Sequence, residues 1–454
     1  MSEPSPAWHS NLYALVPHPA EPHVLMLQSA AGWSLPHVKL EQYVWFGDVS
    51  HIAQAMRREL GVDVAILGCV DARADGDAHR NEAIYTLEPQ SQAWAPPPSG
   101  RWVDRAALAG LPLAQPEQRQ AIERYLAEAE SGAIPALRPP WARPGWFAAA
   151  SAWLESQLAR RGYTLVAPVE QVKSWGISCI LRARTASGDF YLKQASTLPL
   201  FADEPALTQA LAARYPEHIP TPIAVAPDRG WMLLADFGPE LRENTDITLW
   251  EAAIRLFAQM QIASAAHIDV LIAAGCLDRR LDRLAEQIDP LLNDTEALAG
   301  LDAAEIARLR ALAPRLKAIC GELASYGVPP TLMHGDLHTG NIAAREDSLL
   351  FFDWTDGCIA HPFLDLITFL DNAAALPDPM TAQAYLRDAY LAEWTAYEPI
   401  AQLREMWALA EPLGALHQAI SYRHILAALE PASKHEMIGS APYFLRKLLE
   451  SLPE

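Results

Sequence analysis

Residues 334–341 read HGDLHTGN, and residues 351–354 read FFDW. These stretches hold two carboxylates and an amide, Asp336, Asp353 and Asn341. Phosphoryl transfer from ATP is catalysed mostly by positioning and charge neutralisation. Asp336 can accept or orient the proton of an attacking hydroxyl, while Asn341 and Asp353 supply oxygen ligands that suit Mg²⁺ together with substrate phosphates. The residue types therefore predict Asp336 as the catalytic carboxylate, and Asn341 and Asp353 as Mg²⁺ ligands.

Short apolar runs flank this loop. Residues 331–333 enter it, and residues 349–352 follow it after a polar turn at 345–348. Both runs predict buried strands, and Gly335 and Gly340 allow the backbone turns that the loop needs. Because such strands hold a loop rigidly, catalytic side chains are often found in this setting.

The pattern continues through residues 353–357 (DWTDG) and 361–366 (HPFLDL). With HGDLHTGN, it resembles the catalytic and metal-binding loops of the aminoglycoside phosphotransferase and choline-kinase-like superfamily, whose members are small-molecule kinases with a protein-kinase-like fold. The resemblance implies an ATP- and Mg²⁺-dependent enzyme. It also implies that Asp365 braces the catalytic loop, that Asp356 is a further polar support, and that His334 forms hydrogen bonds within the loop.

A nucleotide-binding lobe is expected before this loop. Residues 169–172 and 179–184 read as two strands, and the turn at 173–178 is placed to lie over ATP phosphates. Ser174 and Gly176 are its candidate phosphate contacts. The turn has one glycine, which makes it a weak phosphate-loop signal.

A lysine ends the next apolar strand, residues 190–194. If it points inward, the Lys193 ammonium can neutralise the α- and β-phosphate oxygens of ATP; the alternative is a strand-end lysine that reaches solvent. Glu204 is the candidate carboxylate to hold Lys193, and Asp203 is its local rival. A Glu in the first turn of a helix also suits the helix dipole alone.

Residues 236–238 spell DFG, the metal motif of protein kinases. They precede the HGD triplet by about a hundred residues, whereas the metal-binding Asp must follow the catalytic loop. The superfamily has its hinge at this position, so Ala235 and Asp236 are expected to meet adenine. Beyond residue 248 the periodicity predicts helices, among them one over 276–292.

Composition excludes some classes of partner. The chain has 454 residues and a formal net charge of −20, which argues against nucleic acid or an anionic membrane as the main partner and suits a cationic substrate. Five cysteines occur without a CxxC pair, so neither a zinc site nor a disulfide framework is predicted. No targeting leader and no run of roughly 18–20 apolar residues is found, so a soluble, cytoplasmic protein is expected.

The first 130 residues have a pattern of their own. A hairpin over 12–27 is followed by a helix over 50–60 that ends at Gly61, and by a strand at 62–67. This order resembles a Nudix hydrolase domain. Of that family's metal carboxylates only Glu59 is present, so diphosphate hydrolysis is not expected. An unrelated small α+β domain is the alternative.

The sequence as a whole predicts an α+β multidomain protein. A Nudix-like α/β/α domain over residues 1–135 precedes a proline-rich linker over 136–145. A protein-kinase-like bilobal fold follows, with a small mixed β lobe over 146–240 and a large helical lobe over 241–454. The predicted reaction transfers the γ-phosphate of ATP to a hydroxyl of a small molecule, such as an aminoglycoside, an amino alcohol or a sugar.

Two other functions stay open at this point. The first is a non-catalytic nucleotide sensor whose N-terminal domain binds a ligand or partner. The second is nucleotide-diphosphate hydrolysis by the N-terminal domain, against which the missing carboxylates argue.

Overall fold

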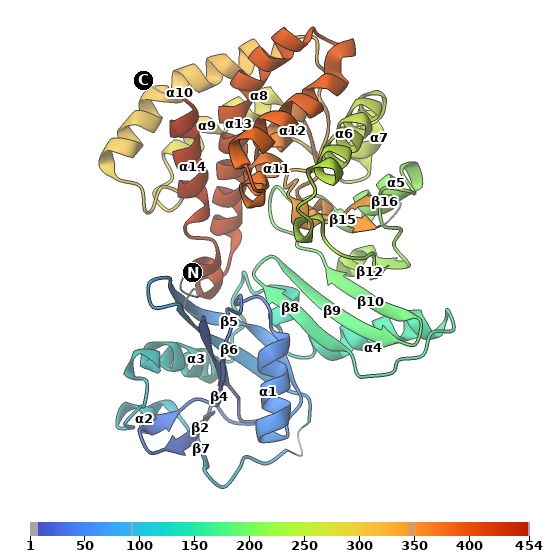
Figure 1. Cartoon of the computed structure of the whole chain (residues 1–454). Coiled ribbons are helices and arrows are strands. Elements are labelled where there is room, and N and C mark those ends of the chain that lie inside the picture. The colour runs from blue at the N-terminus through green and yellow to red at the C-terminus, as the bar shows by residue number, and fades with distance from the viewer. Residues whose placement is uncertain (1–7, 92–93, 346–347, 453–454) are drawn as a thin grey trace, which may run out of the picture. The chain divides into compact units, whose positions relative to one another are not determined.

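The structure is a computed structural model that describes residues 8–91, 94–345 and 348–452. The chain forms two compact units, described separately below (Figure 1). The N-terminal unit comprises residues 1–194 and 429–436, and the C-terminal unit comprises residues 195–428 and 437–454. The division after residue 194 lies inside the predicted β lobe, and the predicted domain boundaries stay predictions.

The N-terminal unit begins with two small sheets. The larger has the strand order β4-β1-β6-β5, in which β1 is parallel to β6 and the other pairs are antiparallel. Its strands are β1 (His9–Leu15), β4 (His37–Leu40), β5 (Val64–Asp75) and β6 (Arg80–Pro89). The smaller, of order β3-β2-β7, consists of β2 (Val24–Ser29), β3 (Gly32–Ser34) and β7 (Gly100–Val103).

Two hydrophobic clusters form on these strands. Helix α1 (Ser50–Leu60) contributes Ile52 and Met56 to one cluster, and α3 (Arg119–Ser131) contributes Ile122 to the other. The predicted helix over 50–60 is confirmed, and Gly61 caps it with the left-handed φ of 67° that favours glycine. A short helix, α2 (Arg105–Ala109), precedes α3.

Three antiparallel strands complete the N-terminal unit. They are β8 (Glu170–Trp175), β9 (Ser178–Thr185) and β10 (Gly188–Gln194), which follow helix α4 (Trp146–Ala159). Side chains of β9 alternate between buried and half-buried along the strand, as its sequence pattern predicts. The pairing of β8 with β9 contains a bulge between Gln171 and Lys173.

The C-terminal unit is mostly helical, as predicted. Its longer helices are α5 (Glu204–Arg214), α6 (Ile247–Ser264), α10 (Ala303–Ala324), α12 (Pro379–Glu393), α13 (Ile400–Ala428) and α14 (Ser440–Ser451). The shorter ones are α7 (Ile268–Ala273), α8 (Leu281–Glu286), α9 (Ile288–Leu292) and α11 (Leu366–Asn372). Its strands are β11 (Ala224–Ala226), β12 (Trp231–Ala235), β13 (Leu277–Asp278), β14 (Thr331–Met333), β15 (Ile342–Arg345), β16 (Ser348–Phe351) and β17 (Cys358–Ala360).

The single helix predicted over 276–292 is wrong. This stretch contains strand β13, which pairs with β17, and two short helices that break at Gln287. Pro290 lies in the first turn of α9, where a missing N–H is tolerated. In the middle of one continuous helix, the same proline would leave a main-chain oxygen of the preceding turn without its hydrogen bond. Periodicity alone did not reveal this break.

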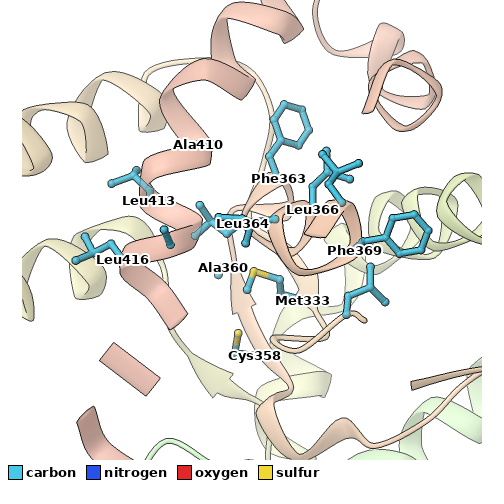
Figure 2. Close-up of a cluster of buried hydrophobic side chains, with 14 of the residues drawn as sticks. Met333, Cys358, Ala360, Phe363, Leu364, Leu366, Phe369, Ala410, Leu413 and Leu416 are labelled. Carbon is cyan, nitrogen blue, oxygen red and sulfur yellow. The ribbon is translucent and has the colours of Figure 1, made fainter. Parts of the chain in front are cut away.

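A large hydrophobic core supports the loop region. Met333, Leu337 and Ile342, from before, within and after residues 334–341, all belong to it. Figure 2 shows part of this core, in which Met333, just before the loop, lies near Ala360 and Leu364, and Leu413 projects from α13. The loop is therefore anchored in tightly packed side chains.

One helical segment of the described chain, Ile247–Ala273, is long and apolar enough to cross a membrane by length and composition. Its helix α6 buries Trp250, Ile254 and Phe257 in the core of the C-terminal unit. This burial is typical of the core helix of a globular unit.

Candidate active site

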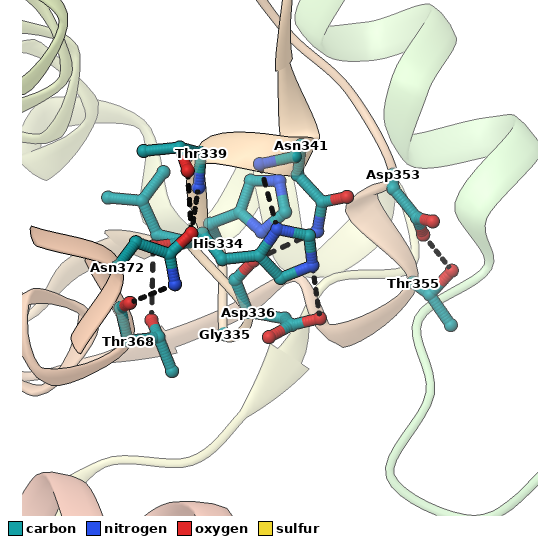
Figure 3. A network of polar contacts seen from close by, with 12 residues as sticks. His334, Gly335, Asp336, Thr339, Asn341, Asp353, Thr355, Thr368 and Asn372 are labelled. Carbon is teal, nitrogen blue, oxygen red and sulfur yellow. Dashed lines mark hydrogen bonds and ion pairs between the residues drawn. The ribbon is translucent and has the colours of Figure 1, made fainter. Parts of the chain in front are cut away.

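A hairpin brings the two predicted metal ligands to one place. Strand β15 begins directly after Asn341, and β16 ends two residues before Asp353. Ile342 pairs with Phe351, and the amide of Phe352 donates to the main-chain oxygen of Asn341 at 3.0 Å. Asn341 therefore lies alongside the residue that precedes Asp353, and its amide oxygen points toward Asp353 (Figure 3).

The carboxylate of Asp336 is accessible, with 39% of its side chain exposed. Nε2 of His338 lies 3.6 Å from its Oδ2, and Nδ2 of Asn341 donates to its main-chain oxygen at 3.0 Å (Figure 3). Because this bond uses the amide nitrogen of Asn341, the amide oxygen is the atom that the predicted metal role would use. Asp336 thus combines an accessible carboxylate with a held backbone, as a proton acceptor requires.

Asp353 adopts a left-handed backbone, with φ 64° and ψ 62°. This conformation costs a non-glycine residue about 1–2 kcal/mol, and such strain is concentrated at functional sites. The Thr355 hydroxyl lies 2.7 Å from Oδ1 of Asp353 and 3.2 Å from Oε2 of Glu204. Thr355 therefore links Asp353 to the start of helix α5.

Glu204 and Asp203 have different environments. Glu204 is the first residue of α5 and is 1% exposed, whereas Asp203 is exposed and caps the helix by accepting from the amide of Ala206 at 3.2 Å. Glu204 is thus the inward-facing carboxylate of the two. Lys193 is buried near the end of β10 in the N-terminal unit, and its pairing with Glu204 stays a prediction.

Asp365 holds the backbone at the start of the loop. Its two carboxylate oxygens accept from the amides of His334 and Gly335 at 2.7 and 2.8 Å, and Nε2 of Gln261 is 3.3 Å away. Burial raises the pKa of Asp365 to about 8, while the two amide donors act in the opposite direction. These contacts agree with the bracing role that the resemblance implied.

His334 is buried and forms part of the scaffold. Its Nε2 lies 2.9 Å from the main-chain oxygen of Phe352, and its ring packs against Trp354 at 4.7 Å between centroids. Burial lowers the pKa of His334, which keeps the imidazole neutral at pH 7. The ring therefore joins the two halves of the site and offers no accessible base.

Gly335 is required by both conformation and space. Its φ is +83°, and a Cβ there would overlap the main-chain oxygen of Asp356. Asp356 therefore supports the loop through close backbone packing, in addition to any role of its carboxylate.

Several residues that hold the loop by hydrogen bonds were not predicted from the sequence. Nδ1 of His338 accepts from the amide of Gly340 at 3.0 Å, so this side chain supports the turn of the loop. Both the amide and the hydroxyl of Thr339 donate to Oδ1 of Asn372 (Figure 3). Gln418 donates to the main-chain oxygen of Gly335 at 2.5 Å. No signal in the sequence identifies Asn372 or Gln418, because both belong to helices far along the chain.

Arg242 is another residue beside the loop that was not predicted from the sequence. A Cβ at Gly340 would overlap its guanidinium, so Arg242 rests directly on the catalytic loop. Its side chain is 55% exposed and paired with Glu240. An ion pair therefore lies beside the loop that carries Asp336 and Asn341.

The predicted phosphate turn is shorter than expected. Strands β8 and β9 leave only residues 176–177 between them, so Ser174 lies within a strand and its side chain is fully buried. The amide of Gly176 donates to Oε2 of Glu436 at 2.6 Å. In this structure, neither the Ser174 hydroxyl nor the Gly176 amide is exposed to a phosphate, because a segment more than 250 residues away covers the turn.

The segment after β12 is held by the hairpin that follows the loop. Ala235 and Asp236 are exposed, and the Asp236 carboxylate accepts from the amide of Gly238 at 3.0 Å. Arg345 donates to the main-chain oxygens of Asp236 and Phe237, both at 2.7 Å. The Asp236 carboxylate is thus used in a local turn, and the prediction that this DFG triplet is not the metal motif stays a prediction.

The donor set suits one kind of metal. Among the described residues, no three His, Cys, Asp or Glu side chains form a group able to hold a metal ion. Mg²⁺ needs fewer protein ligands, since it usually takes one or two carboxylates with substrate phosphates and water. The Asn341 amide oxygen and the Asp353 carboxylate therefore fit Mg²⁺ that enters with a nucleotide.

The sequence profile of the phosphotransferase enzyme family matches residues 180–400. This region contains the loop from His334 to Asp353, and also Asp365. The match supports the kinase-like superfamily and confirms the prediction that the chain is a phosphotransferase enzyme. The Nudix resemblance of the first 130 residues stays a prediction.

No curated protein matches the chain. Among solved structures, choline kinase from Cryptosporidium parvum Iowa II is 11% identical with a TM-score of 0.47, covering 68% of this chain and 91% of that one. The GDP complex of aminoglycoside 2'-phosphotransferase-IIIa is 14% identical with a TM-score of 0.47, covering 66% and 98%. Plasmodium vivax ethanolamine kinase is 12% identical with a TM-score of 0.45, covering 62% and 81%.

Proposed function

We propose that this chain is a Mg²⁺-dependent kinase that transfers the γ-phosphate of ATP to a hydroxyl group of a small molecule. The observation that carries this proposal is the loop that holds an accessible carboxylate, Asp336, beside the oxygen donors of Asn341 and Asp353. The family match over residues 180–400 supports the same reaction class.

Each side chain of the loop has a distinct task. Asp336 accepts or orients the proton of the acceptor hydroxyl. Asn341 and Asp353 hold Mg²⁺, which neutralises the charge of the phosphates when it is bound. Thr355 holds the Asp353 carboxylate, and Asp365 holds the backbone that leads into Asp336.

The nucleotide is held by residues before the loop. Lys193 neutralises the α- and β-phosphate oxygens, and Glu204 fixes the position of its ammonium group. Main-chain groups of Ala235 and Asp236 meet the adenine ring. This proposal extends the family resemblance residue by residue to the positions that match it.

The acceptor is an aminoglycoside, an amino alcohol or a sugar. The formal charge of −20 favours a cationic acceptor through long-range attraction, and it disfavours nucleic acid and anionic membranes as partners. We place the reaction in the cytoplasm, where ATP and Mg²⁺ are available.

The test is ATP consumption by the full chain with pools of aminoglycosides, amino alcohols, sugars and nucleosides. One pool should stimulate turnover, with a requirement for Mg²⁺, and Asp336→Asn should reduce the stimulated rate by at least 100-fold, at the low end of the contribution of a general base. Asp282→Asn, an exposed substitution on α8, is the matched control and should keep the wild-type rate. Equal rates for wild type and Asp336→Asn would contradict the proposal.

A non-catalytic nucleotide sensor is the second candidate. It is kept because the Gly176 amide is already bonded to Glu436 and Ser174 is buried, so neither candidate contact is placed to hold a phosphate for transfer. The same experiment separates the two functions, because a sensor would bind ATP in a titration but give no turnover with any pool.

A further inference from the structure

The N-terminal unit contains a cavity of about 700 Å³. This volume lies within the usual range of small-molecule sites. Strands β5 and β6, helix α3, the linker after it, the β8–β9 turn and residues 430–436 all contribute to its walls. Every lining residue belongs to the N-terminal unit, whereas the proposed catalytic loop belongs to the C-terminal unit.

The walls of the cavity are largely apolar and aromatic. Tyr125, Trp94, Trp141 and Trp175 line it. The indole N–H groups of Trp94 and Trp141 are engaged elsewhere, since they donate to the main-chain oxygens of Leu60 and Trp175. The rings therefore offer the cavity flat apolar surfaces and π faces, which favour apolar groups and cations.

The charged groups of the cavity are mostly acidic. Four carboxyl groups line it against two guanidinium groups, those of Arg124 and Arg138. Burial raises the pKa of one of the four, Glu436, so the negative charge comes from the other three. Arg138 is already bonded to two of these carboxylates: Nε and Nη2 donate to Glu430 at 2.6 Å, and Nη2 also lies 2.8 Å from both carboxylate oxygens of Glu128. This triad keeps one net negative charge, and its cation is not available to an anionic ligand.

The other two carboxylates are Glu88 and Glu436. Oε1 of Glu88 accepts from the amide of Gly145 at 2.8 Å, while its Oε2 is buried and has no hydrogen-bond partner among the described residues. Glu436 is half-buried and accepts from the amide of Gly176 at 2.6 Å. Because the Glu88 side chain lines the cavity, a cationic donor bound there can pair with its carboxylate.

We propose that this cavity is a second small-molecule site, and that it binds an organic amine. The protonated amine pairs with the carboxylate of Glu88, which lines the cavity, and the apolar body of the ligand lies against the aromatic rings of Trp94, Tyr125 and Trp141. The site is independent of the proposed phosphoryl transfer, because none of the loop residues takes part in it.

The experiment is calorimetric titration of the full chain with three matched probes, 4-phenylbutylamine, 4-phenyl-1-butanol and 4-phenylbutyrate. The amine should bind at least tenfold more tightly than the alcohol, because it adds a charged hydrogen bond, and the carboxylate should not bind. Glu88→Gln should weaken amine binding about tenfold, whereas Glu59→Gln, on the exposed surface of α1, should leave it unchanged.

Two further variants locate the site. Gly68 lines the cavity, and a Cβ there would meet no atom within 4 Å, so Gly68→Leu should fold and remove amine binding by filling space. Asp336→Asn should bind the amine as wild type does, which separates this site from the proposed acceptor site. The proposal is overturned if the three probes bind equally, if the carboxylate binds best, if none binds, or if Gly68→Leu and Glu88→Gln bind the amine as wild type does.

Discussion

At the scale of single residues, the site depends on positions whose role is conformational. Gly335 has φ +83° and no room for a Cβ beside Asp356, and Asp353 has a left-handed backbone without being glycine. Gly335 directly precedes the predicted catalytic residue Asp336, and Asp353 is itself a predicted metal ligand. The local backbone is therefore as specific to this site as its carboxylates.

Gly335→Ala should lower the free energy of unfolding more than Gly300→Ala, a glycine-to-alanine change in the same unit. Gly300 also has a positive φ, +97°, but a Cβ there would meet no atom within 4 Å. Both substitutions incur backbone strain of about 1–2 kcal/mol, and Gly335→Ala adds an overlap that costs about 1–3 kcal/mol more. Urea unfolding of Gly335→Ala and Gly300→Ala measures the difference, and equal stabilities would contradict the proposed packing against Asp356.

Glu436 should make the stability of the chain depend on pH. Burial raises its pKa to about 8, from 4.5, so the folded chain retains a proton that the unfolded chain loses between these values. The stabilising effect of the protonated group is complete below pH 4.5 and is lost as the pH rises toward 8. Glu436→Gln keeps an acceptor for the Gly176 amide without titrating. Its stability relative to wild type should therefore rise from pH 5 to pH 8.

Denaturant unfolding at pH 5, 6.5 and 8 checks this expectation. Glu59→Gln is the matched control, because it makes the same change on the surface of α1. A stability difference between Glu436→Gln and wild type that does not change with pH would show that Glu436 is ionised in the folded chain.

At the scale of elements, the loop is held by helices that follow it in the chain. Asp365 precedes α11 and bonds to the amides of His334 and Gly335, Asn372 ends α11 and bonds to Thr339, and Gln418 of α13 bonds to the main-chain oxygen of Gly335. The hairpin of β15 and β16 adds the bond between Phe352 and Asn341. The geometry of the site is therefore set by packed elements rather than by the loop alone.

Gln418→Met should uncouple α13 from the loop. The change keeps the length of the side chain but removes the donor to the buried main-chain oxygen of Gly335, which costs about 1–3 kcal/mol. If the proposed function holds, turnover should fall about tenfold, because Asp336 follows Gly335 directly. Gln402→Met, near the start of the same helix, is the control for unfolding and turnover, and a Gln418→Met variant as stable as this control would contradict the role of the bond.

At the scale of the whole molecule, residues 429–436 follow α13 of the C-terminal unit yet belong to the N-terminal unit. Within that unit, Glu430 bonds to Arg138 of the linker, and Glu436 bonds to the amide of Gly176. These pairs are separated by 292 and 260 residues of sequence. The N-terminal unit therefore contains a segment from near the end of the chain, held by these contacts.

Arg138→Ala should destabilise the N-terminal unit strongly. Glu430 is 6% exposed, and loss of its partner leaves a buried charge, which costs about 3–5 kcal/mol. Arg105→Ala removes an exposed ion pair with Glu130 from the same unit and should cost less than about 1 kcal/mol. The two variants are compared by thermal unfolding and by proteolysis. An equally small effect in both would mean that the contacts of Arg138 with Glu128 and Glu430 do not stabilise the unit.

The sequence by itself determined the features that depend on neighbouring residues. The HGD loop, the Asn five positions after its Asp, the Gly61 helix end and the strands of residues 170–194 all follow from local spacing, because backbone conformation and periodicity are set over a few residues. The enzyme class, which the family match confirmed, was also predictable from that spacing.

Tertiary structure decided the contacts between distant residues. It gave Glu204 an inward position and Asp203 a capping role, placed Arg242 on Gly340, and broke the helix predicted over 276–292. It also turned the Gly176 amide toward Glu436 and formed the cavity beside Glu88. The physical reason is that burial, hydrogen-bond partners and cavities depend on which distant segments pack together, and local sequence patterns do not determine that packing.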